Sequence, residues 1–342
     1  MKKSNNPLLY PLSWLYGLGV GLRNFLFNQG ILKRQSYPIP LICVGNITVG
    51  GTGKTPHVEL LISILRKQHR IAVISRGYKR KSRGLREVTL TSTAEEVGDE
   101  PKQIKQKYPE VRFVVDGNRR RAMRYLLALP EGERPDVVLL DDGFQHRYVH
   151  PSFSILPIDA QRELHDDELL PFGGLREPAT SRYRADCIVP TKCPHAMQPI
   201  PLRIMQRNLD LYAHQEIFFS RICYQQPRAV RTLLGEAASP LPKDALVIAL
   251  SGIASPGLFF TYLGERYELI DQLVYPDHHH FRPKDFTAIS ERWQELCEQY
   301  SGRPVYIVCT EKDAVRFTDS LGELPEALVK QLYFLPIETQ IL

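Results

Sequence analysis

A glycine-rich loop between an apolar run and a helical pattern carries the clearest chemical signal in this 342-residue chain. Residues 41–46 read as a buried strand, and a helix is predicted from 56 to 68. Glycines let backbone N–H groups close around phosphate oxygens, and a helix N-terminus adds partial positive charge. Lys54 would reach the β- and γ-phosphates of a nucleotide, and the Thr55 hydroxyl would bind Mg²⁺. The predicted phosphate-binding residues are Thr48, Val49, Gly50, Gly51, Thr52, Gly53, Lys54 and Thr55.

One position departs from the usual phosphate-loop pattern, because Thr48 stands where that pattern has glycine. A plain glycine-rich turn is the alternative. The strand before the loop and the helix after it favour the nucleotide site.

A pair of carboxylates, Asp141 and Asp142, follows the apolar run 137–140. An apolar run that ends in Asp is common and is often only a helix cap. Together with the phosphate loop, however, it supplies the acidic partner that Mg²⁺ needs in a nucleotide enzyme or switch. We predict Thr55, Asp141, Asp142 and Glu100 as metal ligands, and spacing leaves open which aspartate binds directly.

Short apolar runs alternate with helical patterns along the chain, which indicates a parallel sheet covered on both faces. Strands are predicted at 41–46, 71–75, 111–115, 137–140, 153–158 and 187–189, with helices at 56–68 and 119–129. The run 216–224 is predicted as a strand that leads into a connection. A second alternation follows, with strands at 245–250, 267–273 and 305–309 and helices near 256–263 and 283–300. The predicted fold class is therefore α/β: a phosphate-loop NTPase-like domain (37–224) and a second, smaller α/β domain (225–342).

The composition excludes several classes of protein. With 43% hydrophobic and 24% charged residues, the chain is neither disordered nor collagen-like. A net charge of +6 suits an anionic partner, such as phosphates or an acidic membrane face, or an ordinary solvated surface. No aromatic-basic platform or helix-turn-helix pattern supports a role with nucleic acid. None of the six cysteines forms a C-x-x-C pair, which indicates reduced, buried thiols in a cytosol-facing protein.

The amino-terminal segment, residues 1–36, is hydrophobic and almost uncharged from 8 to 22. Pro11 and Arg23 interrupt it, so it is a poor candidate for a spanning helix. We predict an interfacial segment with Trp14 at headgroup depth and basic residues, such as Arg23 and Arg34, toward anionic lipid. The alternative is a helix packed on its own domain.

Further motifs narrow the choice of function. They are Ser75-Arg76-Gly77-Tyr78, Val97-Gly98-Asp99-Glu100-Pro101, Leu140-Asp141-Asp142-Gly143-Phe144-Gln145-His146, Gly174-Leu175-Arg176-Glu177-Pro178, Asp277-His278 and Thr310-Glu311-Lys312-Asp313. Together with the phosphate loop, this ordered set closely resembles the tetraacyldisaccharide 4′-kinases, the lipid A 4′-kinases of Gram-negative bacteria. The resemblance covers residues 44–313. It implies transfer of the ATP γ-phosphate to the 4′-hydroxyl of a tetraacyldisaccharide 1-phosphate, at the cytoplasmic face of the bacterial inner membrane.

A sugar hydroxyl needs a group that accepts its proton, and Asp99 is the candidate base, in a predicted turn at 98–101. Without the family, Asp99-Glu100 would read as a solvated acidic turn. The resemblance pairs Asp99 with His278, and Lys54 completes the predicted catalytic set.

The substrate side of the site is predicted from guanidinium, carboxylate and loop residues that suit phosphates and sugar hydroxyls. These residues are Arg76, Tyr78, Gln145, His146, Arg176 and Glu177. For each arginine, a surface ion pair is the alternative. The basic run 119–121 is predicted to be a solvated face, and Thr191-Lys192 and 310–313 are weak candidates for reading the nucleotide base.

Two other functions remain open from the residues alone. A nucleotide-dependent metallochaperone would use His278-His279-His280 and Cys193 with His195, but no second cysteine stands at C-x-x-C spacing. A phosphate-loop kinase of a soluble small molecule would leave the hydrophobic amino terminus without a use.

Overall fold

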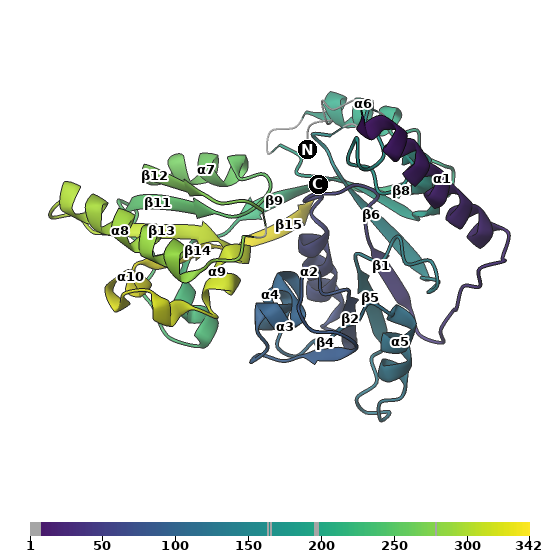
Figure 1. Ribbon diagram of the computed structural model, residues 1–342, viewed down its shortest axis with the longest axis horizontal. Coiled ribbons are helices and arrows are strands. Elements are labelled where there is room, and N and C mark those ends of the chain that lie inside the picture. The colour runs from purple at the N-terminus through teal and green to yellow at the C-terminus, as the bar shows by residue number, and fades with distance from the viewer. Residues whose placement is uncertain (1–7, 163, 165, 195–197, 278) are drawn as a thin grey trace.

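The computed structural model describes residues 8–162, 164, 166–194, 198–277 and 279–342. In these ranges the strands form two main sheets with helices on their faces, joined by a two-stranded ribbon (Figure 1). We call the eight-stranded sheet with its helices the large lobe, and the five-stranded sheet with its helices the small lobe. The predicted α/β architecture is confirmed.

The large-lobe sheet has the order β3-β4-β2-β5-β1-β6-β7-β8. Its strands are β1 (Leu41–Val44), β2 (Ile71–Ser75), β3 (Arg86–Val88), β4 (Arg112–Val115), β5 (Val137–Asp141), β6 (Phe153–Asp159), β7 (Cys187–Thr191) and β8 (Glu216–Ile217). All neighbours pair in parallel except β3, an antiparallel edge strand that the prediction of a purely parallel sheet missed. The unbroken apolar strands are buried because helices cover both faces. The phosphate loop and the acidic pair both follow carboxyl ends of central strands, β1 and β5, which are direct neighbours.

The helices of the large lobe are α1 (Leu9–Asn28), α2 (Lys54–Leu65), α3 (Ala94–Val97), α4 (Asp99–Lys107), α5 (Arg119–Leu127) and α6 (Pro199–Asn208). Val58 and Ile62 of α2 pack on one face of the sheet with Val44 of β1. Ala122 and Met123 of α5 pack on the other face. Packing on both faces holds β1 in place, and the phosphate loop begins where β1 ends.

The small-lobe sheet has the order β10-β14-β13-β11-β12. Its strands are β10 (Arg228–Ala229), β11 (Leu246–Ser251), β12 (Glu268–Val274), β13 (Val305–Thr310) and β14 (Leu332–Leu335), and its helices are α7 (Gly257–Gly264), α8 (Pro283–Gln299), α9 (Glu311–Phe317) and α10 (Glu326–Lys330). Phe259 of α7 packs on one face of the sheet, and Phe286 of α8 and Phe317 of α9 pack on the other. The lobe therefore has its own core.

The run predicted as one strand at 216–224 is in fact two strands in different sheets. Residues 216 and 217 form β8, an edge strand of the large-lobe sheet. In contrast, β9 (Ser220–Tyr224) pairs antiparallel with β15 (Ile337–Ile341). This ribbon joins the lobes (Figure 1). The chain thus crosses between the lobes at the same place on its way out and on its way back.

Helices α4 and α9 meet across the lobes, and charged side chains carry much of their contact (Figure 1). Lys102 Nζ lies 2.6 Å from Asp319 Oδ1, and Lys107 Nζ lies 2.6 Å from Glu59 Oε2 and 3.3 Å from Glu311 Oε1. Lys102 is almost fully buried, so its pair with Asp319 is stronger than an exposed pair would be.

Helix α1 packs on the large lobe with one side and exposes apolar residues on the other. Phe27 is buried, Arg23 donates to the Gln145 carbonyl at 2.8 Å, and Asn24 donates to Glu177 at 2.9 Å. Trp14, in contrast, is 63% exposed. The predicted orientation of Arg23 and Arg34 toward lipid stays a prediction; Arg23 Nη2 bonds the Gln145 carbonyl, and Arg34 Nη2 donates to the Phe27 carbonyl of α1 at 3.3 Å. In the described part of the chain, no helix combines the length and apolar character needed to span a membrane.

Candidate active site

The phosphate loop is held in shape by backbone pairing with the segment 174–176. Val49 N donates to the Gly174 carbonyl and Arg176 N donates to the Ile47 carbonyl, each at 2.7 Å. Thr48 forms an antiparallel bridge with Leu175 and is buried. Because Thr48 lies in such a bridge, the position does not require glycine. This explains why the chain departs from the usual phosphate-loop pattern here.

The end of the loop turns sharply into α2. Gly53 adopts φ +82°, in the left-handed region that favours glycine, and Lys54 begins the helix. Asn46 donates to Thr52 Oγ1 at 3.0 Å, and Thr191 Oγ1 donates to the Thr52 carbonyl at 3.0 Å. Thr191, a candidate for reading the nucleotide base, therefore supports the loop, and the neighbouring Lys192 pairs with Asp159 at 2.6 Å.

Asp142 lies between two cations at the end of β5. Arg176 Nη1 lies 2.9 Å from both of its carboxylate oxygens, and Lys54 Nζ lies 3.7 Å from Oδ1. Burial alone would raise the pKa of Asp142, but Lys54 and Arg176 together hold it below its ordinary value. The carboxylate is therefore charged and orients the two cations that would face a nucleotide phosphate.

Asp141 is buried one residue earlier and has a different environment. Its Oδ2 accepts from Ser75 Oγ at 2.9 Å, whereas its Oδ1 has no hydrogen-bond partner among the described residues. Burial and the negative charges of Glu100 and Asp142 raise the pKa of Asp141 to about 7. The influence of Glu100 also means that the start of α4 lies close to the end of β5.

These acidic groups fit a divalent cation. A buried carboxylate oxygen without a partner, among other carboxylates, is the environment that a hard cation neutralises. Asp141, Asp142 and Glu100 would supply oxygen ligands, and Thr55 lies in the first turn of α2 next to Lys54. Within the described ranges, no group of three or more His, Cys, Asp or Glu could hold a metal by itself. Mg²⁺ commonly takes only one or two carboxylates, with waters and substrate phosphates in the other positions.

Asp99 lies at the start of α4, not in the turn that the sequence predicts at 98–101. Gly98, with φ +98°, ends α3, and the next helix begins at once. Arg316 of α9 donates to Asp99 Oδ2 from Nη2 at 2.7 Å and from Nε at 2.9 Å. Lys312 Nζ lies 3.3 Å from Glu100 Oε1. Arg316 of the small lobe thus contacts the candidate base Asp99 directly.

The predicted partner of Asp99, His278, lies outside the described residues. Its neighbour His279 directs Nε2 to Asp285 Oδ2 of α8 at 2.9 Å. The imidazole of His279 is therefore engaged within the small lobe.

The predicted substrate residues fall into two groups. Arg76 and Tyr78 follow β2 and are exposed, and Gln145 donates to the Asn46 carbonyl at 2.7 Å, beside the phosphate loop. Glu177 lies apart from them: it is 2% exposed and accepts from Arg184 and Asn24. Both of these bonds reach Oε2, whereas Oε1 is buried without a hydrogen-bond partner among the described residues, so the substrate role of Glu177 stays a prediction.

His146 is neutral in this environment. Burial, with the positive charges of Arg119 and Arg23, lowers the pKa of His146 to about 4. Its Nε2 is buried without a hydrogen-bond partner among the described residues. A neutral imidazole with an unused nitrogen is suited to a hydrogen bond with a polar ligand.

The prediction of a solvated face at 119–121 is wrong for Arg119, which is buried. Burial lowers its pKa, and the nearby Asp142 and Asp141 raise it, so this guanidinium lies within electrostatic reach of the acidic pair. Arginine remains charged in such a site. Helical phase offered a signal, because in the amphipathic pattern of α5 Arg119 shares a face with Ala122 and Met123.

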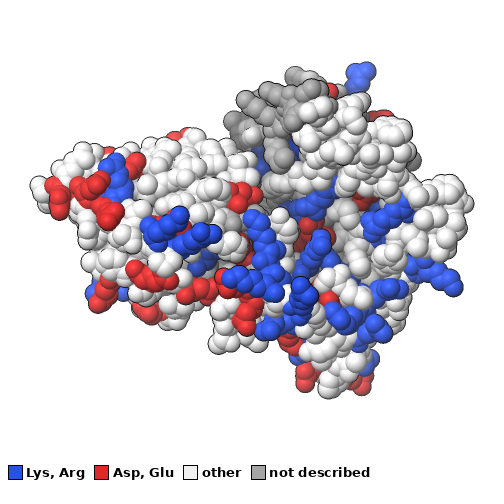
Figure 2. Space-filling model, in the orientation of Figure 1, with Lys and Arg blue, Asp and Glu red and all other residues white. Residues whose placement is uncertain are grey.

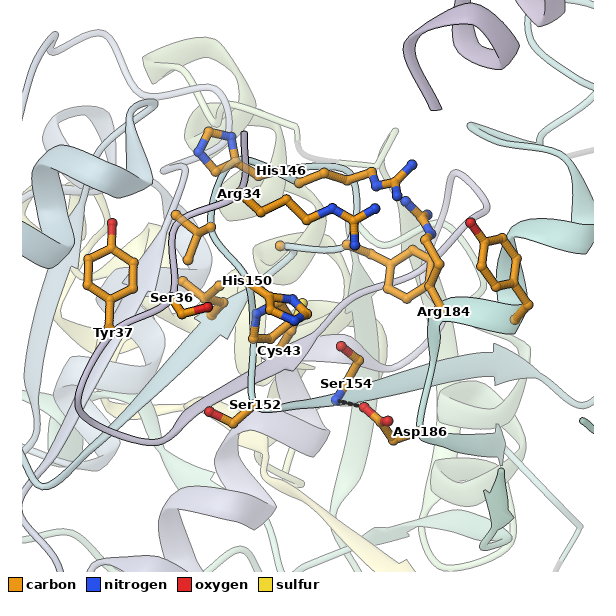
Figure 3. A pocket seen from close by; sticks show the side chains of 17 residues that line it. Arg34, Ser36, Tyr37, Cys43, His146, His150, Ser152, Ser154, Arg184 and Asp186 are labelled. Atoms are coloured by element: carbon orange, nitrogen blue, oxygen red, sulfur yellow. Dashed lines mark hydrogen bonds between the residues drawn. The ribbon is translucent and has the colours of Figure 1, made fainter. Parts of the chain in front are cut away.

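A cavity of about 530 Å³ is lined by residues of the loop 143–152 and of the segments 34–37 and 183–186 (Figure 3). Its lining includes His146, His150 and the basic residues Arg34, Arg147 and Arg184. Neither Lys54 nor Asp142 lines it. The cavity is therefore distinct from the phosphate loop, and it borders the site through His146 and through Leu140 and Gly143, which flank the acidic pair.

Comparison with known proteins gives a consistent result. Residues 5–341 match the family model described as tetraacyldisaccharide-1-P 4′-kinase. The tetraacyldisaccharide 4′-kinase of Porphyromonas gingivalis strain W83 is 46% identical over 337 residues, 98% of this chain and 93% of that protein. The enzyme of the same name from Parabacteroides distasonis is 45% identical over 339 residues, covering 97% and 89%.

A solved structure agrees over the full length. The crystal structure of LpxK from Aquifex aeolicus in complex with ATP has a TM-score of 0.72 and 28% sequence identity, and the match covers 97% of this chain and 93% of that one. The family model, the relatives and this structure each span nearly all of the residues described above. The chain therefore belongs to the tetraacyldisaccharide-1-P 4′-kinase family.

Proposed function

We propose that this protein transfers the γ-phosphate of ATP to the 4′-hydroxyl of a tetraacyldisaccharide 1-phosphate, a lipid A precursor. The observation that carries the proposal is the meeting of two acidic segments at the phosphate loop. Asp142 pairs with Lys54 of the loop, and Glu100, next to Asp99, lies close enough to raise the pKa of Asp141. A nucleotide cradle and a candidate base for an acceptor hydroxyl thus share one edge of the sheet.

Each group has a defined task in this proposal. Lys54 and Arg176 stabilise negative charge on the transferring phosphoryl group. Asp99 accepts the proton of the 4′-hydroxyl, and His278 holds and tunes that carboxylate. Thr55 and one or two of the carboxylates Asp141, Asp142 and Glu100 would hold Mg²⁺, which when bound neutralises charge on the β- and γ-phosphates.

Positive charge around the site supports an anionic acceptor. Figure 2 shows Lys and Arg side chains gathered where the lobes meet, on the side of the large lobe. Arg76 is exposed, and the charges of Arg119, Arg23 and Arg76 all act on His146. A substrate that carries a 1-phosphate, together with ATP, is attracted by such a surface.

The exposed apolar side of α1 supports peripheral binding to the cytoplasmic face of the bacterial inner membrane. Leu12, Trp14, Leu18 and Leu22 are all more than half exposed on this helix. A helix that exposes apolar side chains in this way is suited to lie in the membrane interface, where an acylated substrate also resides. We propose 1–36 as the membrane-associating segment, 37–224 as the kinase domain and 225–342 as the second domain, with β15 returning to the ribbon.

Turnover of a detergent-dispersed tetraacyldisaccharide 1-phosphate with ATP and Mg²⁺ tests this function, with the 4′-phosphorylated product identified by mass spectrometry. Lys54→Ala should lower kcat by more than tenfold, about 1.4 kcal/mol on the barrier, with an unchanged melting temperature. A wild-type protein that phosphorylates only water-soluble sugars, or a Lys54→Ala variant that keeps more than a tenth of kcat, contradicts the proposal.

A further inference from the structure

We infer that Arg316, from the small lobe, is a positioning residue for the candidate base Asp99. Both Nη2 and Nε of this guanidinium donate to Asp99 Oδ2, at 2.7 and 2.9 Å. The inference rests on the proposed role of Asp99 in the kinase reaction. It adds a residue that acts on the acceptor side through the base and that belongs to the other lobe.

Arg316 is itself held rigidly by its own lobe. Its Nη1 donates to Asp313 Oδ1 at 2.7 Å and to the Gly252 carbonyl at 3.2 Å. Asp313 is 0% exposed, and its Oδ2 accepts from Gly252 N at 2.8 Å and from Thr310 Oγ1 at 2.6 Å. A side chain at Gly252 would place its Cβ 2.8 Å from Asp313 Oδ1, so the close approach requires glycine.

This anchor lies at the place where an open α/β sheet usually binds a ligand. Gly252 follows β11 and Thr310 ends β13, and these neighbouring strands run in parallel. The chain leaves β11 for β12 on one side and returns to β13 on the other, which makes this a topological switch point. At this point Asp313 accepts a hydrogen bond from Arg316, and Arg316 in turn donates to Asp99.

Other contacts already hold the lobes together, so the pair of Arg316 with Asp99 is not required for that purpose. Lys102 with Asp319 and Lys107 with Glu311 already connect α4 to the small lobe, and Lys107 also pairs with Glu59 of α2 within the large lobe. The antiparallel pairing of β9 with β15 also joins the lobes. A guanidinium that is fixed by a fully buried carboxylate and donates twice to one oxygen is suited to fixing an orientation.

Orientation matters in this chemistry because phosphoryl transfer is catalysed mainly by positioning and electrostatic stabilisation. A catalytic group displaced by about 1 Å can cost on the order of 100-fold in rate. Asp99 is the first residue of α4, at the end of the large lobe that faces α9. Arg316 adds a constraint on this carboxylate from the other lobe, and it does so only when the lobes stand as they do here.

The test is a set of steady-state measurements on the full-length protein with ATP, Mg²⁺ and the detergent-dispersed acceptor. Arg316→Met removes the charge and the hydrogen bonds, and Arg316→Lys keeps the charge but loses the fork. Asp319→Asn is the matched control, because it weakens another pair across the same interface. We expect Arg316→Met to lower kcat by about 10- to 100-fold, with the KM for ATP within twofold of wild type. Arg316→Lys should recover part of this loss, and Asp319→Asn should stay within twofold.

A double-mutant cycle with Asp99→Asn decides whether Arg316 acts through Asp99. In the Asp99→Asn background, Arg316→Met should cost less than a further twofold. A full additional loss there, or an Asp319→Asn defect as large as that of Arg316→Met, overturns the inference. Failure of the proposed base is distinguishable, because Asp99→Asn would then keep the wild-type kcat whatever Arg316 does. The melting temperature of each variant separates these effects from unfolding.

Discussion

Replacing Asp141 with asparagine should stabilise the metal-free protein while it weakens the enzyme. The carboxylate is buried, and its pKa rises from 3.8 to about 7 on folding. A carboxyl group with a raised pKa destabilises the folded state as the pH rises above 3.8, and the cost is complete once the pH passes about 7. Three pH units at about 1.4 kcal/mol each amount to roughly 4 kcal/mol at pH 8, and to about 2 kcal/mol at pH 5. The asparagine side chain is nearly isosteric with aspartate and carries no charge, so the variant escapes this cost.

The assay is urea-induced unfolding of wild type and Asp141→Asn in the presence of EDTA, at pH 5 and pH 8. The expected gain in unfolding free energy is about twice as large at pH 8 as at pH 5. Adding Mg²⁺ and nucleotide should narrow the difference, because ligands that bind the native wild type stabilise it. Turnover of the variant should fall sharply under all conditions.

Asp116→Asn is the matched control of opposite sign. Asp116 is also buried, but Arg121 donates to both of its oxygens, at 2.6 and 2.8 Å. Burial opposes ionisation, yet the pairing with Arg121 lowers the pKa of Asp116 below its ordinary value, so this variant should lose stability at both pH values. A gain for Asp141→Asn that is equal at pH 5 and pH 8, or a loss like that of the control, would refute the reasoning.

Two further predictions concern α1 and the cysteines. Trp14→Asp and Leu18→Asp should each reduce co-sedimentation with anionic phospholipid vesicles by about tenfold or more and leave ATP binding unchanged, since each removes an exposed apolar side chain; unchanged co-sedimentation would place membrane contact elsewhere. Native alkylation followed by mass spectrometry should label Cys223 and Cys297, which are partly exposed, before the four buried cysteines. Burial raises the pKa of Cys43 to about 12, which leaves almost no thiolate at neutral pH, so early labelling of Cys43 would contradict the fold around it.

The features that sequence predicted well are encoded locally. The apolar runs at β1, β2 and β5 are unbroken, which is typical of strands buried on both faces, and their ends could be read to within a residue or two. The phosphate loop combines glycines with a strand before and a helix after, so its position and its lysine follow from short-range signals alone. For α4 the signal was present but was read as a turn, because Asp99 and Glu100 in the first turn also mark the start of a helix.

The features that sequence missed depend on partners far along the chain. Residues 216–224 read as one strand, and only the pairing of β9 with β15 divides them between two sheets. The burial of Glu177 and the contacts of its Oε2 with Arg184 and with Asn24 of α1 also depend on residues outside its motif. Arg316 carries no local mark of function, since its significance arises where α9 meets α4.

The ribbon of β9 and β15 has a consequence for the order in which the protein can be assembled during translation. Residues 225–336, which include every strand of the small lobe, are synthesised after β9 and before β15. Throughout that interval β9 presents the hydrogen-bonding edge that β15 later fills, and an open strand edge invites pairing with another chain. Both sheets can thus be complete while the junction between them still consists of β9 alone. In a nascent or truncated chain that ends before Ile337, the open edge of β9 can pair with a strand of another molecule.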